Sequence, residues 1–225
     1  MRKQLLSALA LSATMAGAQA GTLLSEGFDN VGGLAAQGWV FTNNSVNPLN
    51  KWMQGSGGIY AAQSGADNSY ATANFTSSTN GTLAQPGAIE NWLITKTFSL
   101  STNLQLSFYA RTEEAVSGWI DQLDVRLSTD GSASGLSSFD KVLLQINADG
   151  EPNGVPDGWT HYVVTVGGLG AGTGRLAFVY KGDGASANDI ALDSLNISSI
   201  PEPASYALIA LGLVGAAVAQ RRRKA

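Results

Sequence analysis

Apolar and polar residues alternate with a period of two through most of this chain, and no stretch keeps a helical period. Leu104–Ala110 and Leu123–Leu127 have the pattern of half-buried strands. Further candidate strands are Leu23–Phe28, Trp92–Phe98, Lys141–Ile146, Thr160–Val166, Arg175–Lys181 and Ile190–Ser198. Turn-rich stretches dense in Gly, Asn, Asp, Ser and Pro separate them. The pattern predicts an all-β antiparallel sandwich or jelly roll, with long loops and one or two short strands over Asn43–Gly81.

Residues 1–20 have the organisation of a bacterial signal peptide. Arg2 and Lys3 precede the apolar run Leu5–Ala16, and Ala18-Gln19-Ala20 gives a small-residue cleavage site. The alternative is an N-terminal anchor that is never removed, but the apolar run is shorter than the ~20 residues that span a bilayer. We expect cleavage after Ala20 and export of the mature chain.

The C-terminal residues 200–225 have three parts. Pro201, Glu202 and Pro203 come first, the uncharged run Ala204–Ala219 follows, and Arg221, Arg222, Arg223 and Lys224 end the chain. The run would form ~24 Å of helix, slightly less than a ~30 Å hydrocarbon core, a deficit that snorkelling arginines can make up. Because basic residues favour the cytoplasmic side, the cluster would act as a membrane stop and the rest of the chain would face outward.

This order of Pro-Glu-Pro, apolar helix and basic end closely resembles the PEP-CTERM sorting signal. The resemblance implies that an exosortase, a membrane transpeptidase-like enzyme, cuts near the motif. The protein would lie transiently in the inner membrane and then move to the cell surface or extracellular matrix. A tail anchor that stays uncut is the alternative that composition alone leaves open.

The remaining residues 21–199 fit one domain with a sizeable core. They carry 16 acidic and 7 basic side chains, a net charge of −9. Such a surface argues against nucleic acid as a partner and is compatible with divalent cations. The chain has no cysteine, which excludes disulfides, thiolate metal sites and a cysteine nucleophile.

Two carboxylates occupy apolar-facing positions in the first and last candidate strands. Glu26 shares its parity with Leu24 and Phe28, and Asp193 shares its parity with Leu195 and Ile197. A buried carboxylate is unfavourable unless it is paired or metal-bound. Because first and last strands often lie close together in sandwiches, Glu26 and Asp193 are candidate ligands of one structural Ca²⁺. The alternative is a bulge that places them in solvent, since Ile190 and Leu192 have the opposite parity from Leu195.

Short segments across most of Gly21–Ser198 resemble the cleaved-adhesin and MAM-like domains, called choice-of-anchor J when they carry sorting tails. The resemblance rests, in order, on Glu26-Gly27-Phe28-Asp29, Gly38-Trp39, Trp52, Asn91-Trp92-Leu93-Ile94, Leu104–Phe108, Leu123–Ser128, Gly158-Trp159-Thr160, Leu176–Tyr180 and Ile190–Asp193. It implies a β jelly roll, often with calcium bound by acidic residues that correspond to Glu26 and Asp193. MAM domains carry cysteines, so nothing follows here from their disulfides.

We expect no enzyme. His161 is the single histidine and lies in a candidate strand, and no Gly-x-Ser-x-Gly motif is present. The favoured function is an adhesive or structural domain in the extracellular polysaccharide layer. A carbohydrate-binding module is the alternative, with Trp119 as a possible glycan contact because it lies near a turn. A glycan hydrolase would require a suitably spaced carboxylate pair in a cleft.

Overall fold

The computed structural model describes residues 21–78, 87–100, 103–113, 118–133 and 135–200, together with the isolated tail positions 211, 212, 215 and 220. The expected signal peptide (1–20), the Pro201–Pro203 motif and the basic cluster Arg221–Lys224 lie outside these described residues. Segment Ala20–Ile200 forms one compact unit. Within the described ranges, no helix is long and apolar enough to cross a membrane.

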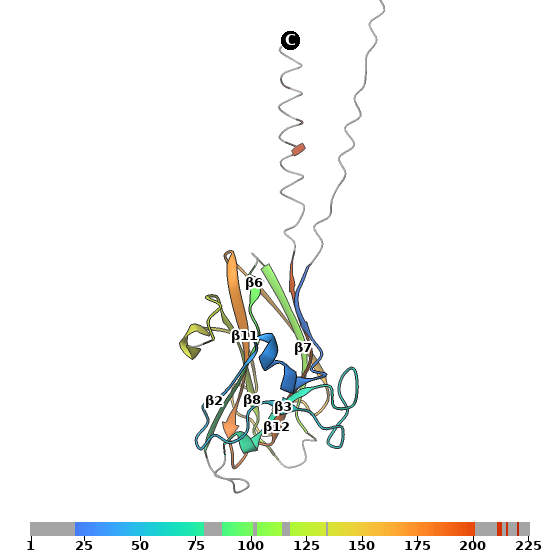
Figure 1. The fold of residues 1–225 in the computed structure, drawn as a ribbon, viewed down its shortest axis with the longest axis vertical. Coiled ribbons are helices and arrows are strands. Elements are labelled where there is room, and N and C mark those ends of the chain that lie inside the picture. Colours follow the sequence, from blue (N-terminus) through green and yellow to red (C-terminus); the bar gives the residue numbers. More distant parts are fainter. Residues whose placement is uncertain are drawn as a thin grey trace, which may run out of the picture. The chain divides into compact units, whose positions relative to one another are not determined.

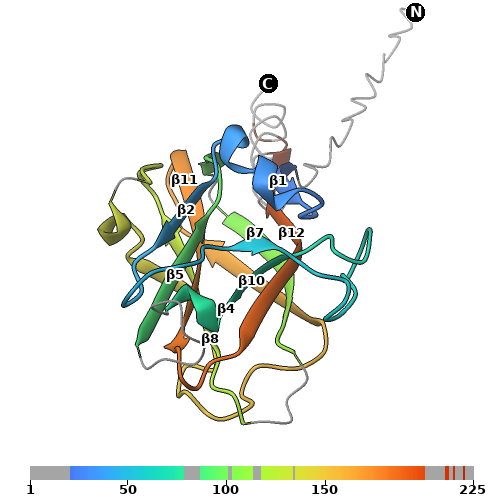
Figure 2. The ribbon, with the colours of Figure 1, turned by 60° about the horizontal axis from the view of Figure 1, so that its bottom comes forward.

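Two antiparallel sheets form the unit (Figures 1 and 2). Sheet A has the order β10 (Thr160–Gly167), β7 (Asn103–Arg111), β12 (Asp189–Ser199), β4 (Ala71–Asn74) and β3 (Met53–Gln54), and β1 (Thr22–Glu26) also pairs with β12. Sheet B has the order β2 (Val40–Asn43), β5 (Ala88–Ile94), β11 (Gly172–Asp183), β8 (Gln122–Ser128) and β9 (Lys141–Ile146), and β6 (Phe98–Leu100) also pairs with β11. The predicted all-β antiparallel sandwich is confirmed.

The 3₁₀ turns η1 (Val31–Gly33), η2 (Ala35–Gln37), η3 (Phe75–Ser77) and η4 (Leu136–Ser138) lie in the connections between strands. The main core lies between the sheets. In β7, Leu104, Leu106, Phe108 and Ala110 are buried and the residues between them are not, so one face of this strand packs inward.

A second, smaller core lies on the other face of sheet B. The loop that contains η4 places Phe139 over Trp92 of β5, with ring centroids 5.8 Å apart, and Ile94 of β5 with Ala177 and Val179 of β11 complete the cluster. Strand β11 is therefore buried on both faces from Leu176 to Tyr180. Arg175 and Lys181, on either side of this stretch, are half-buried.

Strand β12 contains a bulge after Asp193. The register against β7 shifts between Asp193 and Asn196, and Ser194 adopts a left-handed φ of 50°. Because one extra residue is inserted, Leu192 before the bulge and Leu195 after it both face the core. The change of parity in the sequence correctly indicated this bulge.

One candidate strand was wrong. The stretch Trp92–Phe98 is not a single strand, since β5 ends at Ile94 and β6 begins at Phe98. Both strands pair with β11, but the regular backbone pairing stops between them. There the Thr95 N–H donates to the Leu176 carbonyl, and the Thr95 hydroxyl replaces a backbone acceptor for the Leu176 N–H. The expectation of short strands in Asn43–Gly81 is confirmed by β3 and β4.

Candidate functional site

Glu26 lies at the end of β1, directly beside the last strand. In the pairing of β1 with β12, Leu24 is opposite Ile197 and Glu26 is opposite Leu195, so the first and last strands are neighbours as expected. The Glu26 side chain is half-buried, and its Oε1 accepts a hydrogen bond from the Phe28 N–H at 2.9 Å. Phe28 itself has a φ of 54° and is fully buried, which ends the strand at this point.

Asp193 is fully buried at the bulge of β12. Its Oδ2 accepts from the Ser64 N–H at 3.0 Å, and its Oδ1 accepts from the Ser194 N–H. Burial raises the pKa of this carboxyl above its usual range, against these hydrogen bonds, which lower it. The expected alternative of a solvent-exposed Asp193 is therefore wrong, because the bulge turns the side chain under the loop that contains Ser64.

The donor set around Asp193 fits a cation only in part. Asp29 lies on the other side of the same loop, where its Oδ1 would be 3.1 Å from a Cβ built on Gly65. Among the described residues, however, no three His, Asp or Glu side chains are close enough to hold a metal ion. Backbone N–H groups already compensate the buried Asp193 carboxylate. Calcium ligation by Glu26 and Asp193 stays a prediction.

The tryptophans divide into two groups. Trp39, Trp52 and Trp92 are buried, as is usual for large aromatic residues in sandwiches. Trp119 and Trp159 are half-buried. Trp119 follows Gly118, whose φ is 72°, and its carbonyl accepts from the Asn153 N–H at 2.7 Å, but its contact with a glycan stays a prediction.

Trp159 belongs to an aromatic cluster on the outer face of sheet A. Tyr60 and Tyr70 stack with their ring centroids 5.0 Å apart, Trp159 packs edge-on against both, and the guanidinium carbon of Arg111 lies 4.1 Å from the Tyr60 ring centroid. The Trp159 indole N–H donates to the Ala61 carbonyl at 2.9 Å. The Trp159 indole N–H and the Tyr60 hydroxyl both have hydrogen-bond partners inside the domain. The cluster therefore holds the loop that contains Tyr60 and Ala61 against sheet A.

A buried carboxylate pair lies beneath this cluster. The Thr112 hydroxyl oxygen is 3.2 Å from Asp121 Oδ2 and 3.1 Å from Asp189 Oδ1. Asp121 also accepts from the Tyr180 hydroxyl at 2.6 Å, and Asp189 accepts from the Tyr60 hydroxyl. Burial raises the pKa of the Asp121 carboxyl to about 6, against the hydrogen bonds from Tyr180 and the Asn188 backbone, which lower it.

This pair does not form a cleft of the kind that a glycan hydrolase uses. Asp121 is 2 % exposed, and although Asp189 lines a hollow of about 180 Å³ together with Glu113, Asp121 does not. His161 lies on the exposed face of β10 and stacks on Tyr109 with ring centroids 4.6 Å apart. Its placement on a strand face is confirmed.

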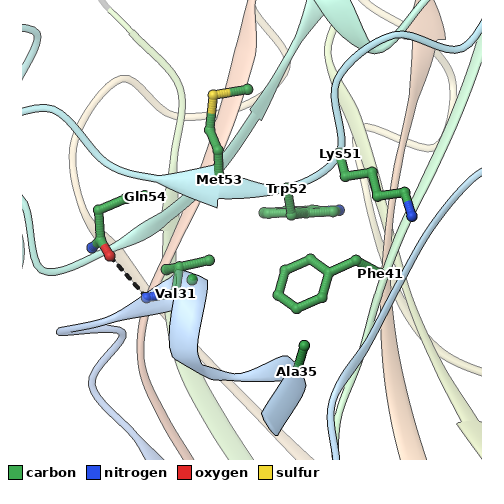
Figure 3. A pocket seen from close by; sticks show the side chains of 8 residues that line it. Val31, Ala35, Phe41, Lys51, Trp52, Met53 and Gln54 are labelled. Atoms are coloured by element: carbon green, nitrogen blue, oxygen red, sulfur yellow. Dashed lines mark hydrogen bonds between the residues drawn. The ribbon is translucent and has the colours of Figure 1, made fainter.

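A pocket of about 380 Å³ lies where β2 and β3, the edge strands of the two sheets, approach the turns η1 and η2. We name it the edge pocket. Figure 3 shows Phe41 and Trp52 on one side of it and Val31 and Ala35, on the helical turns, on the other. Gly32, Lys51, Met53 and Gln54 complete the lining.

The polar groups of the edge pocket mostly point into the protein. Gln54 accepts from the Val31 N–H at 2.8 Å and donates to the Phe28 carbonyl at 2.8 Å, and the Trp52 indole N–H donates to the Asn91 carbonyl at 3.0 Å. Lys51 is exposed at the rim and is the one charged residue of the lining. The pocket therefore offers apolar surface and a single cation, which suits binding of an apolar group and supplies no acid–base pair.

The fold and this pocket define a β-sandwich domain of the jelly-roll type. The tail shows how the protein is sorted, because residues 199–224 match the PEP-CTERM protein-sorting motif. This chain thus carries a PEP-CTERM tail and is an exported, cell-surface protein. A sequence search of curated proteins gives no significant match.

Solved structures with a similar fold include two cleaved adhesin domains of Lys-gingipain from Porphyromonas gingivalis W83. The K1 domain is 20 % identical, with a TM-score of 0.56, over 80 % of this chain and 100 % of that one. The K3 domain is 19 % identical, with a TM-score of 0.55, over 81 % and 100 %. The CBM22-1 xylan-binding domain from Paenibacillus barcinonensis Xyn10C is 17 % identical, with a TM-score of 0.45, over 84 % and 100 %. The resemblance to cleaved-adhesin domains is confirmed at the level of the fold.

Proposed function

We propose that this exported protein is sorted through its tail by an exosortase-like enzyme and that its β-domain makes adhesive or structural contacts in the extracellular matrix, without turnover. The sorting motif at 199–224 supports the first part of the proposal. The observation that carries the second part is the edge pocket, which presents apolar surface at the sandwich edge while the polar atoms of Gln54 and Trp52 are bound to backbone groups of the domain.

The sorting step is tested in a bacterium that contains an exosortase. The native chain is compared with a variant in which Pro201, Glu202 and Pro203 are all replaced by Ala. We expect the native protein at the cell surface or in the matrix with a mass that lacks the tail, and the variant in the inner membrane with its tail intact, by cell fractionation and mass spectrometry. An identical location and an uncut tail in both would indicate a simple tail anchor.

The adhesive step is tested in the same cells with Met53→Glu, which places a charge at the edge pocket. Val142→Glu is the matched control, because Val142 is also apolar and is 45 % exposed on β9, the far edge strand of sheet B. We expect Met53→Glu to lower the fraction of protein retained in washed matrix about tenfold, equivalent to about 1.4 kcal/mol, and Val142→Glu to leave it unchanged. Equal retention of Met53→Glu and the native protein would refute the role of the pocket.

A further inference from the structure

A second hollow, of about 570 Å³, lies on the outer face of sheet B beside the small core formed by Phe139 and Trp92. We name it the sheet-B groove. The register of the strands builds its floor, because Val179 of β11 is opposite Trp92 of β5 on one side and Asp124 of β8 on the other. Residues two positions along each strand share this face, so Glu90, Lys181 and Arg126 also point outward.

One buried carboxylate fixes the two cations of the groove. Asp124, whose side chain is 3 % exposed, accepts from Arg126 Nη2 at 2.7 Å and lies 3.5 Å from Lys181 Nζ. The Gln145 amide donates to its other oxygen at 3.0 Å. Burial acts to raise the pKa of Asp124, but the hydrogen bonds from Gln145 and Arg126 and the charge of Lys181 outweigh it, so the pKa of this carboxyl lies below its usual range.

Two charged side chains of the groove keep part of their hydrogen-bonding capacity among the described residues. Arg126 contacts Asp124 through Nε and Nη2, and within this part of the chain Nη1 has no hydrogen-bond partner. Glu90 accepts from the Trp92 indole N–H through Oε1 at 2.9 Å, and its Oε2 likewise has no partner among the residues that the structure describes. The side chains of Arg126 and Lys181 are 29 % and 36 % exposed, so both reach solvent while Asp124 holds their position.

The groove differs from the edge pocket in a way that selects the ligand. It combines the exposed apolar side chain of Val46 with donors and acceptors on Asn44, Glu90, Arg126 and Lys181. Such a combination suits a pyranose, which presents C–H groups on its ring face and pairs of hydroxyls at its rim. Trp92 is only 4 % exposed, so recognition here depends on hydrogen bonds more than on aromatic stacking.

Charge decides between neutral and acidic sugars. The charges of Arg126 and Lys181 in the lining are balanced by Glu90, also in the lining, and by the buried Asp124 that contacts both cations, while residues 21–199 carry a net charge of −9. A polyanion would therefore meet long-range repulsion with no local excess of positive charge to offset it. We propose that the sheet-B groove binds a neutral polysaccharide of pyranose units. This inference rests on the proposed non-catalytic role and adds a second contact of the domain, whose ligand class it names.

The test uses the full exported chain in mild detergent and measures binding to three soluble neutral polymers, dextran, galactan and hydroxyethyl cellulose, with alginate as the polyuronate probe. Glu90→Gln keeps an acceptor for Trp92 and removes the charge, and Lys181→Met keeps the apolar stem. Lys141→Met is the matched control, since Lys141 is exposed on β9 and is not part of the groove lining. Melting curves show whether each variant is folded.

We expect at least one neutral polymer to bind with the same Kd at about 20 mM and about 300 mM salt, since no net charge is neutralised. The double variant Glu90→Gln/Lys181→Met should weaken binding at least about tenfold, or about 1.4 kcal/mol, and Lys141→Met should not. Binding of none of the neutral polymers, unchanged binding by the folded double variant, or binding of alginate alone would overturn the proposal. Matrix retention is measured separately with Met53→Glu, so absence of glycan binding would reject the groove and leave the adhesive role of the edge pocket standing.

Discussion

Asp193 and Asp121 are both buried in the domain, but their surroundings differ. Backbone N–H groups of Ser64 and Ser194 donate to Asp193, so its charged form is compensated by fixed dipoles. Asp121 accepts from the Tyr180 and Thr112 hydroxyls and lies near the second carboxylate, Asp189. Burial raises the pKa of both carboxyls, and that of Asp121 reaches about 6, so Asp121 is the residue chosen to report on pH, while Asp193 is tested for its predicted calcium binding.

Calcium is expected to stabilise the protein if Glu26 and Asp193 bind it as the family resemblance implies. At a calcium concentration of about 100 times Kd, the gain is ~2.7 kcal/mol, or ~5 to 11 °C in Tm. The measurement is thermal unfolding with calcium and with chelator for the native protein and for Glu26→Gln/Asp193→Asn, which keeps most hydrogen bonds. Identical melting temperatures in all four conditions would contradict calcium binding by Glu26 and Asp193.

The pH dependence of stability should report on Asp121. Its folded pKa of about 6 is above the usual value of 3.8, so its favourable contribution is complete below about pH 4 and is lost as pH rises through 6. Asp121→Asn does not titrate and keeps an acceptor for the Tyr180 hydroxyl. The variant should therefore gain stability relative to the native protein as pH rises from about 4 to about 7, by at most about 3 kcal/mol over the whole window.

Denaturant unfolding at several pH values measures this difference. Asp149→Asn, on an exposed turn, is the control and should follow the native curve at every pH. Parallel curves for Asp121→Asn and the native protein would contradict the assignment of the titration to Asp121.

At the scale of elements, β11 is the central strand of sheet B. It pairs with β5, β6 and β8 and is buried on both faces over Leu176–Tyr180. Close approach of its neighbours is possible at Gly174, because a Cβ there would lie 2.9 Å from the Ser128 carbonyl oxygen and 2.6 Å from Leu100 Cδ2. Both distances are too short for a side chain, so this position requires glycine.

Gly174→Ala should accordingly lower the free energy of unfolding by about 1–3 kcal/mol, the range for overpacking of a core. Gly170→Ala is the control, since a Cβ at Gly170 would meet no atom within 4 Å. Urea unfolding at constant m-value measures both variants. Equal urea midpoints of unfolding for the two alanine variants would show that β6 and β8 move to accommodate the new methyl group without loss of packing.

Elements with a clear period were predictable, and elements held by distant contacts were not. Strand β9, Lys141–Ile146, has the predicted bounds, and β7 extends one residue beyond the predicted stretch at each end. Strand β2, Val40–Asn43, was missed because all four residues are half-buried and show no alternation. The break between β5 and β6 depends on pairing with β11, which local sequence does not report.

The candidate sites follow the same division. The adjacency of Glu26 and the last strand was expected because first and last strands often lie close together in sandwiches, and the bulge at Asp193 was indicated by the change of parity. Burial of Asp193 was also expected, but its partner Ser64 was not, because Ser64 comes from a loop without periodicity. The edge pocket was missed for the same reason, since η1 and η2 form it and neither turn has an apolar period.

At the scale of the whole molecule, the two hollows are distributed over different parts of the sandwich. The edge pocket is apolar and lies at the edge strands β2 and β3, whereas the sheet-B groove is polar and lies over the strands β5, β11 and β8. The two proposed contacts therefore use separate surfaces. Variants in one should leave the other intact, which is what allows matrix retention and glycan binding to be tested independently.

The pairing of β1 with β12 has a mechanical consequence. The chain enters the domain at Gly21 and leaves it after Ser199, and these residues exchange hydrogen bonds, with Ser199 N–H donating to the Gly21 carbonyl at 2.9 Å. A protein held by its tail transmits any pull through β12, which is hydrogen-bonded to β7, β4 and β1. A force along β12 acts on its hydrogen bonds to β7, β4 and β1 at the same time rather than one after another. The strand that leads to the tail is therefore held in the geometry that resists shear.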